Sequence, residues 1–465
     1  MRVGITRPST LDPALATTPD ELLMAGQLYR SLTAYDPASL APVPSLAASW
    51  TSSADQRHWD FKLAPGVRFS DGRPITAADV VASLQRVEAD RSASPGAALL
   101  EEVSGITAPQ SDVVHLDLAA PLAVLPSVLG STNLAVLPAG TGVIPERPVV
   151  SGPFLIRLLG SSQLVLQAVP GGTALVDGVE FDFFPDAAAS YQAFVDGRLD
   201  WSRVPADHVA GAEARYGSAG VAPYLAELFY GFNLQSPTFA DSRFRQAIVQ
   251  AVDRDVIIKS VYHGSVLPLD NVVVGIPGYP APLCRDACHY DPAAARALLA
   301  AAFPGHAPPA VIIDYDEDPT QEAVAKAIGG DLAAVGIAVT LRGKPLAAYQ
   351  AFAASGQLQL FHLGWVAGFP SPDAFLGPLF GSRSAANLTR LGSAAVDSAL
   401  LAARQEPHVS QRMADYAAAE RGALALVPVI PIGQYQTAAV ISGRTRGLVT
   451  PLTGFVDFSR VWLAS

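Results

Sequence analysis

Two cysteines are the residues whose spacing most directly suggests chemistry. Cys284 and Cys288 are the only cysteines in the sequence, and three residues separate them. Neighbouring cysteines can form a disulfide, remain free thiols, or bind zinc, here together with His289. A structural zinc site needs four ligands, and this segment offers at most three. The spacing therefore favours a disulfide that closes a small loop, and the other two states stay open.

An acidic run is a second place where chemistry is conceivable. Residues 314–318 read Asp-Tyr-Asp-Glu-Asp and follow a predicted strand. Carboxylates bind hard cations, but neighbouring carboxylates repel one another and do not converge on one ion without a fixed turn. We expect a solvated loop here and no metal.

Motifs for catalysis are missing from the sequence. It contains no His-Glu-x-x-His, no Gly-x-x-x-x-Gly-Lys-Ser/Thr and no Gly-x-Ser-x-Gly. Its eight histidines have no partner at local metal-ligand spacing. They are His58, His115, His208, His263, His289, His306, His362 and His408. We therefore expect a protein that is not an enzyme and has no cofactor.

Composition narrows the class further. The chain has 465 residues, half of them hydrophobic, which suits a large core and about three domains. The 42 acidic and 31 basic residues leave a net charge of -11, so no basic field exists for nucleic acid. No apolar run reaches the length of a membrane span. Residues 1–8 lack the apolar core of a signal peptide, which fits either a cytoplasmic start or a leader that has been removed.

Strands and helices alternate in the predicted secondary structure. Residues 59–63 alternate as a half-buried strand does, and residues 76–79 form a capping box that opens a helix. Helices are also predicted from about residue 241 and at 291–299. A strand at 310–314, a helix at 321–335 and a strand at 337–341 predict an α/β unit with a parallel crossover.

Ordered motifs along nearly the whole chain carry a family resemblance. The most specific is the block at 59–81, Trp-Asp-Phe-Lys-Leu-Ala-Pro-Gly-Val-Arg-Phe-Ser-Asp-Gly-Arg-Pro-Ile-Thr-Ala-Ala-Asp-Val-Val. Others are Pro-Ser-Leu-Ala-Ala-Ser-Trp at 44–50, Tyr-Gly-Phe-Asn at 230–233, Phe-Arg-Gln-Ala-Ile at 244–248 and Leu-Gly-Trp at 363–365. With these motifs the chain resembles the peptide/nickel-binding receptors of bacterial ABC importers, extracellular solute-binding family 5.

The resemblance implies a fold and a division into domains. The fold class is α/β, a two-lobed periplasmic-binding-protein type II-like fold with an additional inserted domain and an interlobe ligand cleft. Residues 1–30, 153–255 and 437–465 would form a discontinuous first-lobe domain, and residues 31–152 a smaller domain inserted in it. Residues 256–436 would form the second lobe, joined to the first by two hinge strands.

One departure from the family pattern bears on the ligand. In peptide-binding members, an Asp three residues after the Gly-Trp pair binds the α-ammonium group of the peptide. Gly368 occupies this position here, since the run at 364–369 reads Gly-Trp-Val-Ala-Gly-Phe. Either Asp373 substitutes through a shifted loop, or the ligand has no free α-amine at this spot or binds differently.

The resemblance also suggests ligand contacts. The ring of Trp365 would cover an apolar part of the ligand while its indole N–H donates to it, with core packing as the alternative. Asn233 is expected mainly as a hinge hydrogen-bonder, and Gly96 is expected to leave a wider pocket. The full set of expected ligand-binding residues is Trp365, Val366, Ala367, Gly368, Phe369, Tyr230, Asn233, Gln434, Tyr435, Thr17, Thr18 and Gly96.

The function implied is capture without chemistry. A substrate-binding protein of an ABC importer would hold a peptide or peptide-sized polar solute and deliver it to membrane permease subunits. It would be an extracytoplasmic monomer, anchored by lipid through a leader absent from this chain, and would bind no nucleic acid. The alternatives are a ligand-sensing module in signalling or regulation, and a receptor for a non-peptide ligand such as a sugar or a metal chelate.

Overall fold

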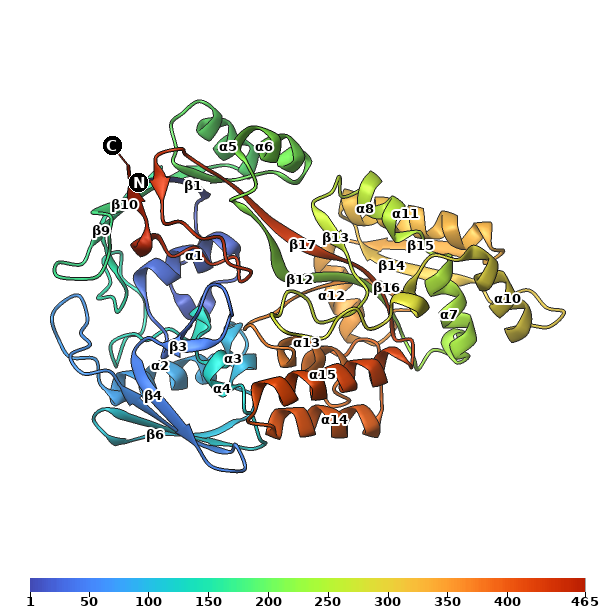
Figure 1. The fold of residues 1–465 in the computed structure, drawn as a ribbon, viewed down its shortest axis with the longest axis horizontal. Coiled ribbons are helices and arrows are strands. Elements are labelled where there is room, and N and C mark those ends of the chain that lie inside the picture. The colour runs from blue at the N-terminus through green and yellow to red at the C-terminus, as the bar shows by residue number, and fades with distance from the viewer. Residues whose placement is uncertain (465) are drawn as a thin grey trace. The chain divides into compact units, whose positions relative to one another are not determined.

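The computed structural model describes residues 1–464 and forms two compact units (Figure 1). Unit 1 contains Met1–Ala222, Gly368–Pro370 and the chain from Thr437 to its C-terminal end. Unit 2 contains Pro223–Ala367 and Ser371–Gln436. The chain passes from one unit to the other inside two long strands, β12 (Val221–Phe232) and β17 (Val429–Ile441), and also on either side of Gly368–Pro370.

The boundary between the units differs from the expected one. The resemblance placed residues up to 255 in the first lobe, whereas unit 2 begins at Pro223. The physical reason is the core of unit 2, in which Phe232, Phe244 and Ile248 are fully buried together with Ile313 and Ile430. The helix at 242–251 is thus part of this second core.

A mixed sheet organises unit 1. Its strand order is β17-β11-β1-β10-β9-β8, in which β1 (Arg2–Thr6) runs parallel to both β10 and β11. Helix α1 (Pro19–Leu28) covers one face, where Leu23 and Met24 pack with Val3, Ile5 and Phe181. The remaining strands are β8 (Phe154–Leu159), β9 (Gln163–Ala168), β10 (Gly178–Phe184) and β11 (Trp201–Arg203).

A second, antiparallel sheet lies within residues 31–152. Its order is β4-β5-β7-β6, made of β4 (Ala47–Ser52), β5 (His58–Leu63), β7 (Val113–Leu118) and β6 (Val103–Gln110). Helix α2 (Ala77–Ala89) begins at the predicted capping box, where the backbone N–H and the hydroxyl of Thr76 both donate to Asp79. Its buried residues Val80, Leu84 and Val87 face the sheet, since α2 packs against β6 and β7. The inserted domain itself stays a prediction.

Unit 2 contains the predicted α/β crossover. Strand β14 (Val311–Asp316) pairs in parallel with β15 (Val339–Lys344), and α11 (Pro319–Ala334) connects them. The strand order is β15-β14-β16-β12-β17, with β16 at Leu360–Val366, and β13 (Val266–Pro268) pairs with β17. The predicted mixed α/β fold class is therefore confirmed, and the interlobe cleft stays a prediction.

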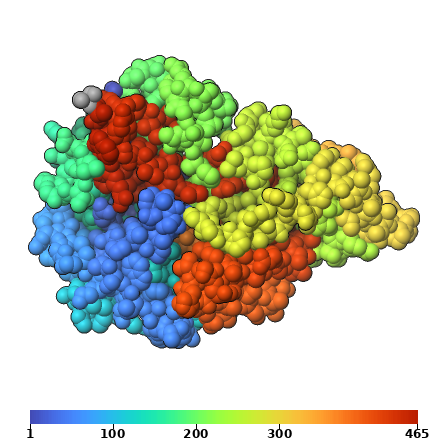
Figure 2. Space-filling model, viewed as in Figure 1, coloured from blue at the N-terminus to red at the C-terminus, as the bar shows by residue number. Residues whose placement is uncertain are grey.

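Helices complete unit 2. Asp291 begins α10 (Pro292–Ala302) by accepting from the N–H groups of Ala293 and Ala294, as the Asp-Pro sequence predicts. Figure 2 shows the segment near residues 265–290, in yellow-green, spread beside the orange-red α14 and α15. The other helices are α7 (Ser242–Ala251), α8 (Arg254–Ser260), α9 (Arg285–Cys288), α12 (Leu346–Ala354), α13 (Asp373–Phe380), α14 (Ala394–Gln405) and α15 (Val409–Leu424).

Short elements fill the connections of unit 1. None of the helices in residues 1–464 combines the length and apolar character needed to cross a membrane. The remaining elements are α3 (Gly96–Leu99), α4 (Leu125–Val128), α5 (Ala187–Val195), α6 (Val209–Tyr216), β2 (Thr33–Tyr35), β3 (Pro42–Pro44), β18 (Thr445–Arg446) and β19 (Trp462–Leu463).

Candidate functional site

Trp365 lies near the end of β16 with its side chain half-buried. Its indole N–H donates to the carbonyl oxygen of Ala374 over 2.7 Å, so this donor is already satisfied inside unit 2. The next residue, Val366, is 54% exposed. In the ligand-free chain the indole N–H is thus used by Ala374, and a ligand contact of Trp365 stays a prediction.

Glu227 is the residue that sequence reasoning missed. It lies on β12 directly opposite Trp365 on β16, and directly paired residues of an antiparallel ladder project from the same face. The side chain of Glu227 is completely buried, and neither carboxylate oxygen has a hydrogen-bond partner among residues 1–464. Burial, and then the nearby Glu420, raise the pKa of Glu227 well above its ordinary value.

Glu420 is a second buried acid, close enough to Glu227 for its charge to raise the pKa of Glu227. It lies on α15 and accepts from the backbone N–H groups of Val272 and Val273 and from the hydroxyl of Tyr279, which is 2.5 Å away. Burial raises the pKa of Glu420 to about 7, although these hydrogen bonds oppose the rise. An unpaired buried carboxylate is costly, so at neutral pH this pair favours binding a proton or another cation.

The sequence does hold a signal for Glu227. The strand at 225–232 reads Leu-Ala-Glu-Leu-Phe-Tyr-Gly-Phe, and Glu227 is the only charged residue in it. A charge in an otherwise apolar strand is either on a solvated face or buried for a reason. The sequence does not say which of these applies to Glu227. The strand pairing with Trp365, more than a hundred positions away, does.

Tyr230 and Asn233 have structural positions. Tyr230 is fully buried in the core of unit 2, where its ring lies 5.9 Å from that of His362 and its hydroxyl has no partner among the described residues. The ligand contact expected of Tyr230 stays a prediction. Asn233 donates to the carbonyl oxygens of Gly356 and Leu358 and accepts from the N–H of Gln235, so its amide is fully used in a turn.

Gln434 and Tyr435 lie half-buried on β17. The amide of Gln434 donates to the carbonyl oxygen of Tyr224 over 2.9 Å. The ring of Tyr435 meets Tyr262 edge-on, with centroids 6.3 Å apart. Both residues lie close to the point where β17 passes out of unit 2, after Gln436.

Thr17 and Thr18 serve the beginning of α1. Thr18 accepts from the N–H of Glu21, while the N–H groups of Thr17 and Thr18 donate back to the carboxylate of Glu21. Burial alone would raise the pKa of Glu21, but these bonds and those from Ser9 outweigh it and lower the pKa to about 2. Both threonines are exposed, yet their local bonds fix a helix end.

Gly96 is a close-packing position. It is buried at the start of α3, and a Cβ atom added there would lie 3.1 Å from Cβ of Asn133 and 3.2 Å from Cγ1 of Val87. The space beside Gly96 is therefore filled by neighbours. This corrects the expectation that the glycine leaves a wider pocket.

The loop after Trp365 is split between the units. The N–H of Ala367 donates to Leu225, but Gly368–Pro370 belong to unit 1. Asp373, considered above as a substitute acid, is buried and accepts from Arg404 over 2.7 Å and from Tyr416 over 3.0 Å. Because these partners already compensate its charge, Asp373 is not a free acid for a ligand.

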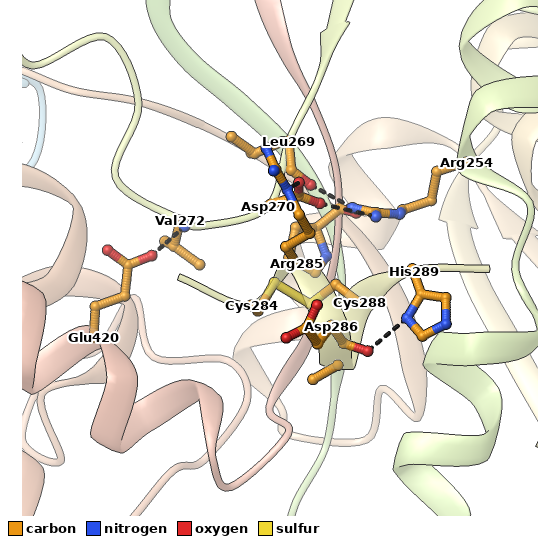
Figure 3. The surroundings of a disulfide bond; sticks show 12 residues. Arg254, Leu269, Asp270, Val272, Cys284, Arg285, Asp286, Cys288, His289 and Glu420 are labelled. Carbon is orange, nitrogen blue, oxygen red and sulfur yellow. Dashed lines mark hydrogen bonds and ion pairs between the residues drawn. A yellow bond between two sulfur atoms is a disulfide. The ribbon is translucent and has the colours of Figure 1, made fainter. Parts of the chain in front are cut away.

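Cys284 and Cys288 form a disulfide with Cα atoms 5.4 Å apart (Figure 3). The N–H groups of Leu283 and Cys284 donate to the carbonyl oxygen of Asp270. His289 bonds to the carbonyl oxygen of Asp286. Figure 3 also shows Glu420 accepting a hydrogen bond from the backbone N–H of Val272.

The acidic run is not the solvated loop that we expected. Its first three residues form the end of β14, and Asp314 is fully buried with Arg342 as its ion-pair partner. Asp316 binds His362 over 3.0 Å, and Asp318 begins α11. The three aspartates have separate partners because the strand and the helix hold them apart, and Glu317 is exposed.

A cavity of about 580 Å³ lies within unit 1, around the ion pair of Asp12 and Arg86. None of the expected ligand-binding residues lines it. The charges of Asp12 and Arg86 compensate each other.

Comparisons with known proteins agree with the fold. Residues 41–387 match the family described as bacterial extracellular solute-binding proteins, family 5. The periplasmic murein peptide-binding protein MppA of Escherichia coli is 25% identical over 95% of this chain and 88% of its own. A putative ABC transporter peptide-binding protein of Brucella ovis is 29% identical over 83% of this chain and 78% of its own.

A solved structure extends the comparison to the whole fold. HbpA2 of Haemophilus parasuis aligns with a TM-score of 0.89 at 22% identity, covering 100% of this chain and 99% of that one. The match to the family covers well over half of the sequence and includes the block at 59–81. This chain belongs to the bacterial extracellular solute-binding proteins of family 5.

Proposed function

We propose that this chain is the substrate-binding protein of an ABC importer and that it captures a peptide outside the cytoplasm. The names of the relatives from Escherichia coli and Brucella ovis support this, since both are described as peptide-binding. The chain would pass its ligand unchanged to membrane permease subunits and would act as a lipid-anchored monomer. It performs no reaction on the ligand.

The observation that carries the proposal is the unpartnered carboxylate of Glu227 beside Trp365. The acid expected three residues after the Gly-Trp pair is missing, because Gly368 stands there. A peptide ammonium group bound at Glu227 supplies the counter-charge that the buried carboxylate lacks. Glu227 lies five residues after Ala222, the last residue of unit 1 on β12.

Other ligand contacts follow from the same strand ends. The ring of Trp365 packs on an apolar part of the ligand, and the residues after it, Val366 to Phe369, supply backbone groups. Gln434 and Tyr435 contribute from β17. Thr17, Thr18, Gly96, Tyr230 and Asn233 keep the structural roles described above.

Binding should be linked to proton release. Burial raises the pKa of Glu227 well above its ordinary value, which favours the protonated acid in the ligand-free protein. An ammonium group favours the ionised carboxylate, so the proton leaves when a peptide with a free N-terminus binds. Affinity for such a peptide therefore increases from pH 5 to pH 7.5.

A thermal-shift screen tests the function. Di-, tri- and oligopeptides with free N-termini should raise the melting temperature by mass action, and their N-acetylated forms should do so far less. Mass spectrometry of whatever co-purifies with the chain should find the peptide unchanged. A response to sugars or metal chelates with none to peptides would contradict the proposal and favour a receptor for a non-peptide ligand.

A variant locates the site. Glu227→Gln keeps the shape of the side chain and should weaken binding of the free peptide at least tenfold while leaving the weak binding of the acetylated peptide unchanged. The surface acid Glu317, which is exposed at the end of β14, provides the matched control as Glu317→Gln. Equal peptide affinity in both variants would show that Glu227 does not bind the peptide, and the proposed function would still stand.

A further inference from the structure

Four chemistry-bearing side chains meet on the solvent-facing side of the antiparallel sheet in unit 1. Strand β5 alternates so that Trp59 and Phe61 are buried while His58 and Asp60 are exposed. Strand β7 alternates in the same way and turns His115 and Asp117 outwards. The register pairs His58 with Asp117 and Asp60 with His115, so a histidine faces an aspartate twice in succession.

The nitrogen and oxygen atoms of this group are close together. Nδ1 of His58 lies 2.7 Å from Oδ1 of Asp117, and Nε2 of His115 lies 3.2 Å from the same oxygen. The ligand atoms of His58, His115 and Asp117 all lie within 4.8 Å of one another. Tetrahedral zinc with bonds of about 2.0–2.1 Å places its ligand atoms about 3.3 Å apart, so only small adjustments separate the two arrangements.

Asp60 bonds to the other ring nitrogen of His115. Its Oδ1 lies 2.8 Å from Nδ1 of His115, which leaves Nε2 of the same ring for Asp117 or for an ion. Histidines that bind metal commonly donate their other ring N–H to a carboxylate, which fixes the tautomer and the ring orientation. The two imidazole rings stack 6.3 Å apart with an angle of 14° between their planes, so both present an edge to the same point.

The surroundings leave this point open and negative. Gly105 of β6 is opposite Asp117, and a Cβ atom there would lie 3.2 Å from Oδ2 of Asp117, so the glycine leaves the carboxylate accessible. Arg57 directs its guanidinium to the backbone carbonyls of Leu118 and Ala119. Lys62 is 3.8 Å from Asp112.

We propose that His58, His115 and Asp117 form a surface site for a late first-row divalent transition-metal ion such as Zn²⁺, with Asp60 as a positioning residue. Imidazole nitrogens and a carboxylate suit such ions better than they suit Mg²⁺ or Ca²⁺, which prefer oxygen ligands alone. Three protein ligands leave a fourth position for water. The ion takes the place of the hydrogen bonds from His58 and His115 to Asp117.

The site is independent of peptide capture. All four residues belong to unit 1 and to one sheet, whereas Glu227 and Trp365 belong to unit 2. An ion bound across β5 and β7 would link two strands whose residues lie 59 positions apart in sequence, and would stabilise this sheet.

Isothermal titration of the chelator-treated full-length chain with zinc chloride tests the proposal. We expect one Zn²⁺ ion per chain, and at least a tenfold loss of affinity in each of His58→Ala, His115→Ala and Asp117→Asn. Asp60→Asn should weaken the site by ~10–100-fold, as loss of an outer carboxylate does. Absorption of a Co²⁺-loaded sample should report nitrogen and oxygen ligands and should change in the His115→Ala variant.

The matched control is His208→Ala. His208 also pairs with an aspartate, 2.8 Å from Asp207, but it lies outside the sheet and should leave zinc affinity unchanged. Peptide-induced melting shifts should be the same in all of these variants. Failure of the wild-type chain to bind zinc below about 1 mM, or equal zinc affinity in wild type and the three ligand variants, would overturn the proposal and leave peptide binding untouched.

Discussion

Glu227 and Trp365 lie directly opposite each other on the antiparallel strands β12 and β16. One is a buried acid without a partner, and the other is a half-buried ring whose N–H is already bonded to Ala374. An uncompensated acid destabilises the fold, so its retention beside an aromatic ring is understandable when a ligand supplies the missing cation. Replacing Glu227 by a neutral residue should therefore raise the free energy of unfolding of the ligand-free protein and weaken peptide binding.

The first prediction concerns pH. Burial raises the folded-state pKa of Glu227 and raises that of Glu420 to about 7, against an unfolded value of 4.5. The folded state thus binds more protons than the unfolded state, so this stabilisation is complete below about pH 4.5 and is lost as pH rises through the folded pKa. The free energy of unfolding of the ligand-free protein should fall between pH 5 and pH 8, by up to about 1.4 kcal/mol per pH unit for each acid.

The variant Glu227→Gln tests the source of this slope. Urea denaturation at pH 5, 6, 7 and 8 should show a shallower fall than in the wild-type protein, with the variant more stable at pH 8. Glu317→Gln, on the surface, should keep the wild-type slope. A slope that is the same in all three proteins would mean that Glu227 does not titrate in this range.

Local patterns of the sequence predict much of this structure. The capping box at Thr76 and Asp79, the Asp-Pro start of α10 and the crossover from β14 to β15 are each encoded within a few residues, and each is found. The family motif at 59–81 likewise contains local signals, among them this capping box. Sequence reasoning therefore predicts the fold class and most elements well.

Long-range register is what the sequence does not reveal. Glu227 meets Trp365, and His58 meets Asp117, only because particular strands pair in a particular register. A shift of one residue would turn each of these side chains to the other face. Burial at Tyr230 and Gly96 likewise depends on neighbours distant in sequence, so local patterns do not predict it.

Gly96 provides the second prediction. Gly96→Ala should lower the free energy of unfolding by about 1–3 kcal/mol, because the added methyl group meets Asn133 and Val87 closer than ordinary contact allows. The control is Gly142→Ala, at an exposed position with no atom within 4 Å of the added Cβ. Denaturation at one pH measures both. Equal stability of the two variants would show that α3 can move aside.

The third prediction concerns the disulfide. The double variant Cys284→Ser/Cys288→Ser should lower the free energy of unfolding by about 2 kcal/mol, which is the chain-entropy estimate for so short a loop. Fold and peptide affinity should persist, since the loop stays bonded to Asp270 through two backbone N–H groups. Denaturation of the wild-type protein with and without a reducing agent should give the same difference. Loss of peptide binding in the double variant would instead tie the loop to the site.

Trp365 provides the fourth prediction, because its ring and its N–H can be separated. Trp365→Phe removes the bond to Ala374 and should cost about 0.5–1.5 kcal/mol of stability while keeping most of the peptide-induced melting shift. Trp365→Ala removes the ring as well and should abolish most of that shift, with the ligand-free melting point within a few degrees of the wild type. Tyr230→Phe, which removes only an unpartnered hydroxyl from the core, should leave the shift unchanged. If ligand-free Trp365→Ala protein collapses while Tyr230→Phe is stable, then the ring of Trp365 serves the core of unit 2, and the peptide is bound by other residues.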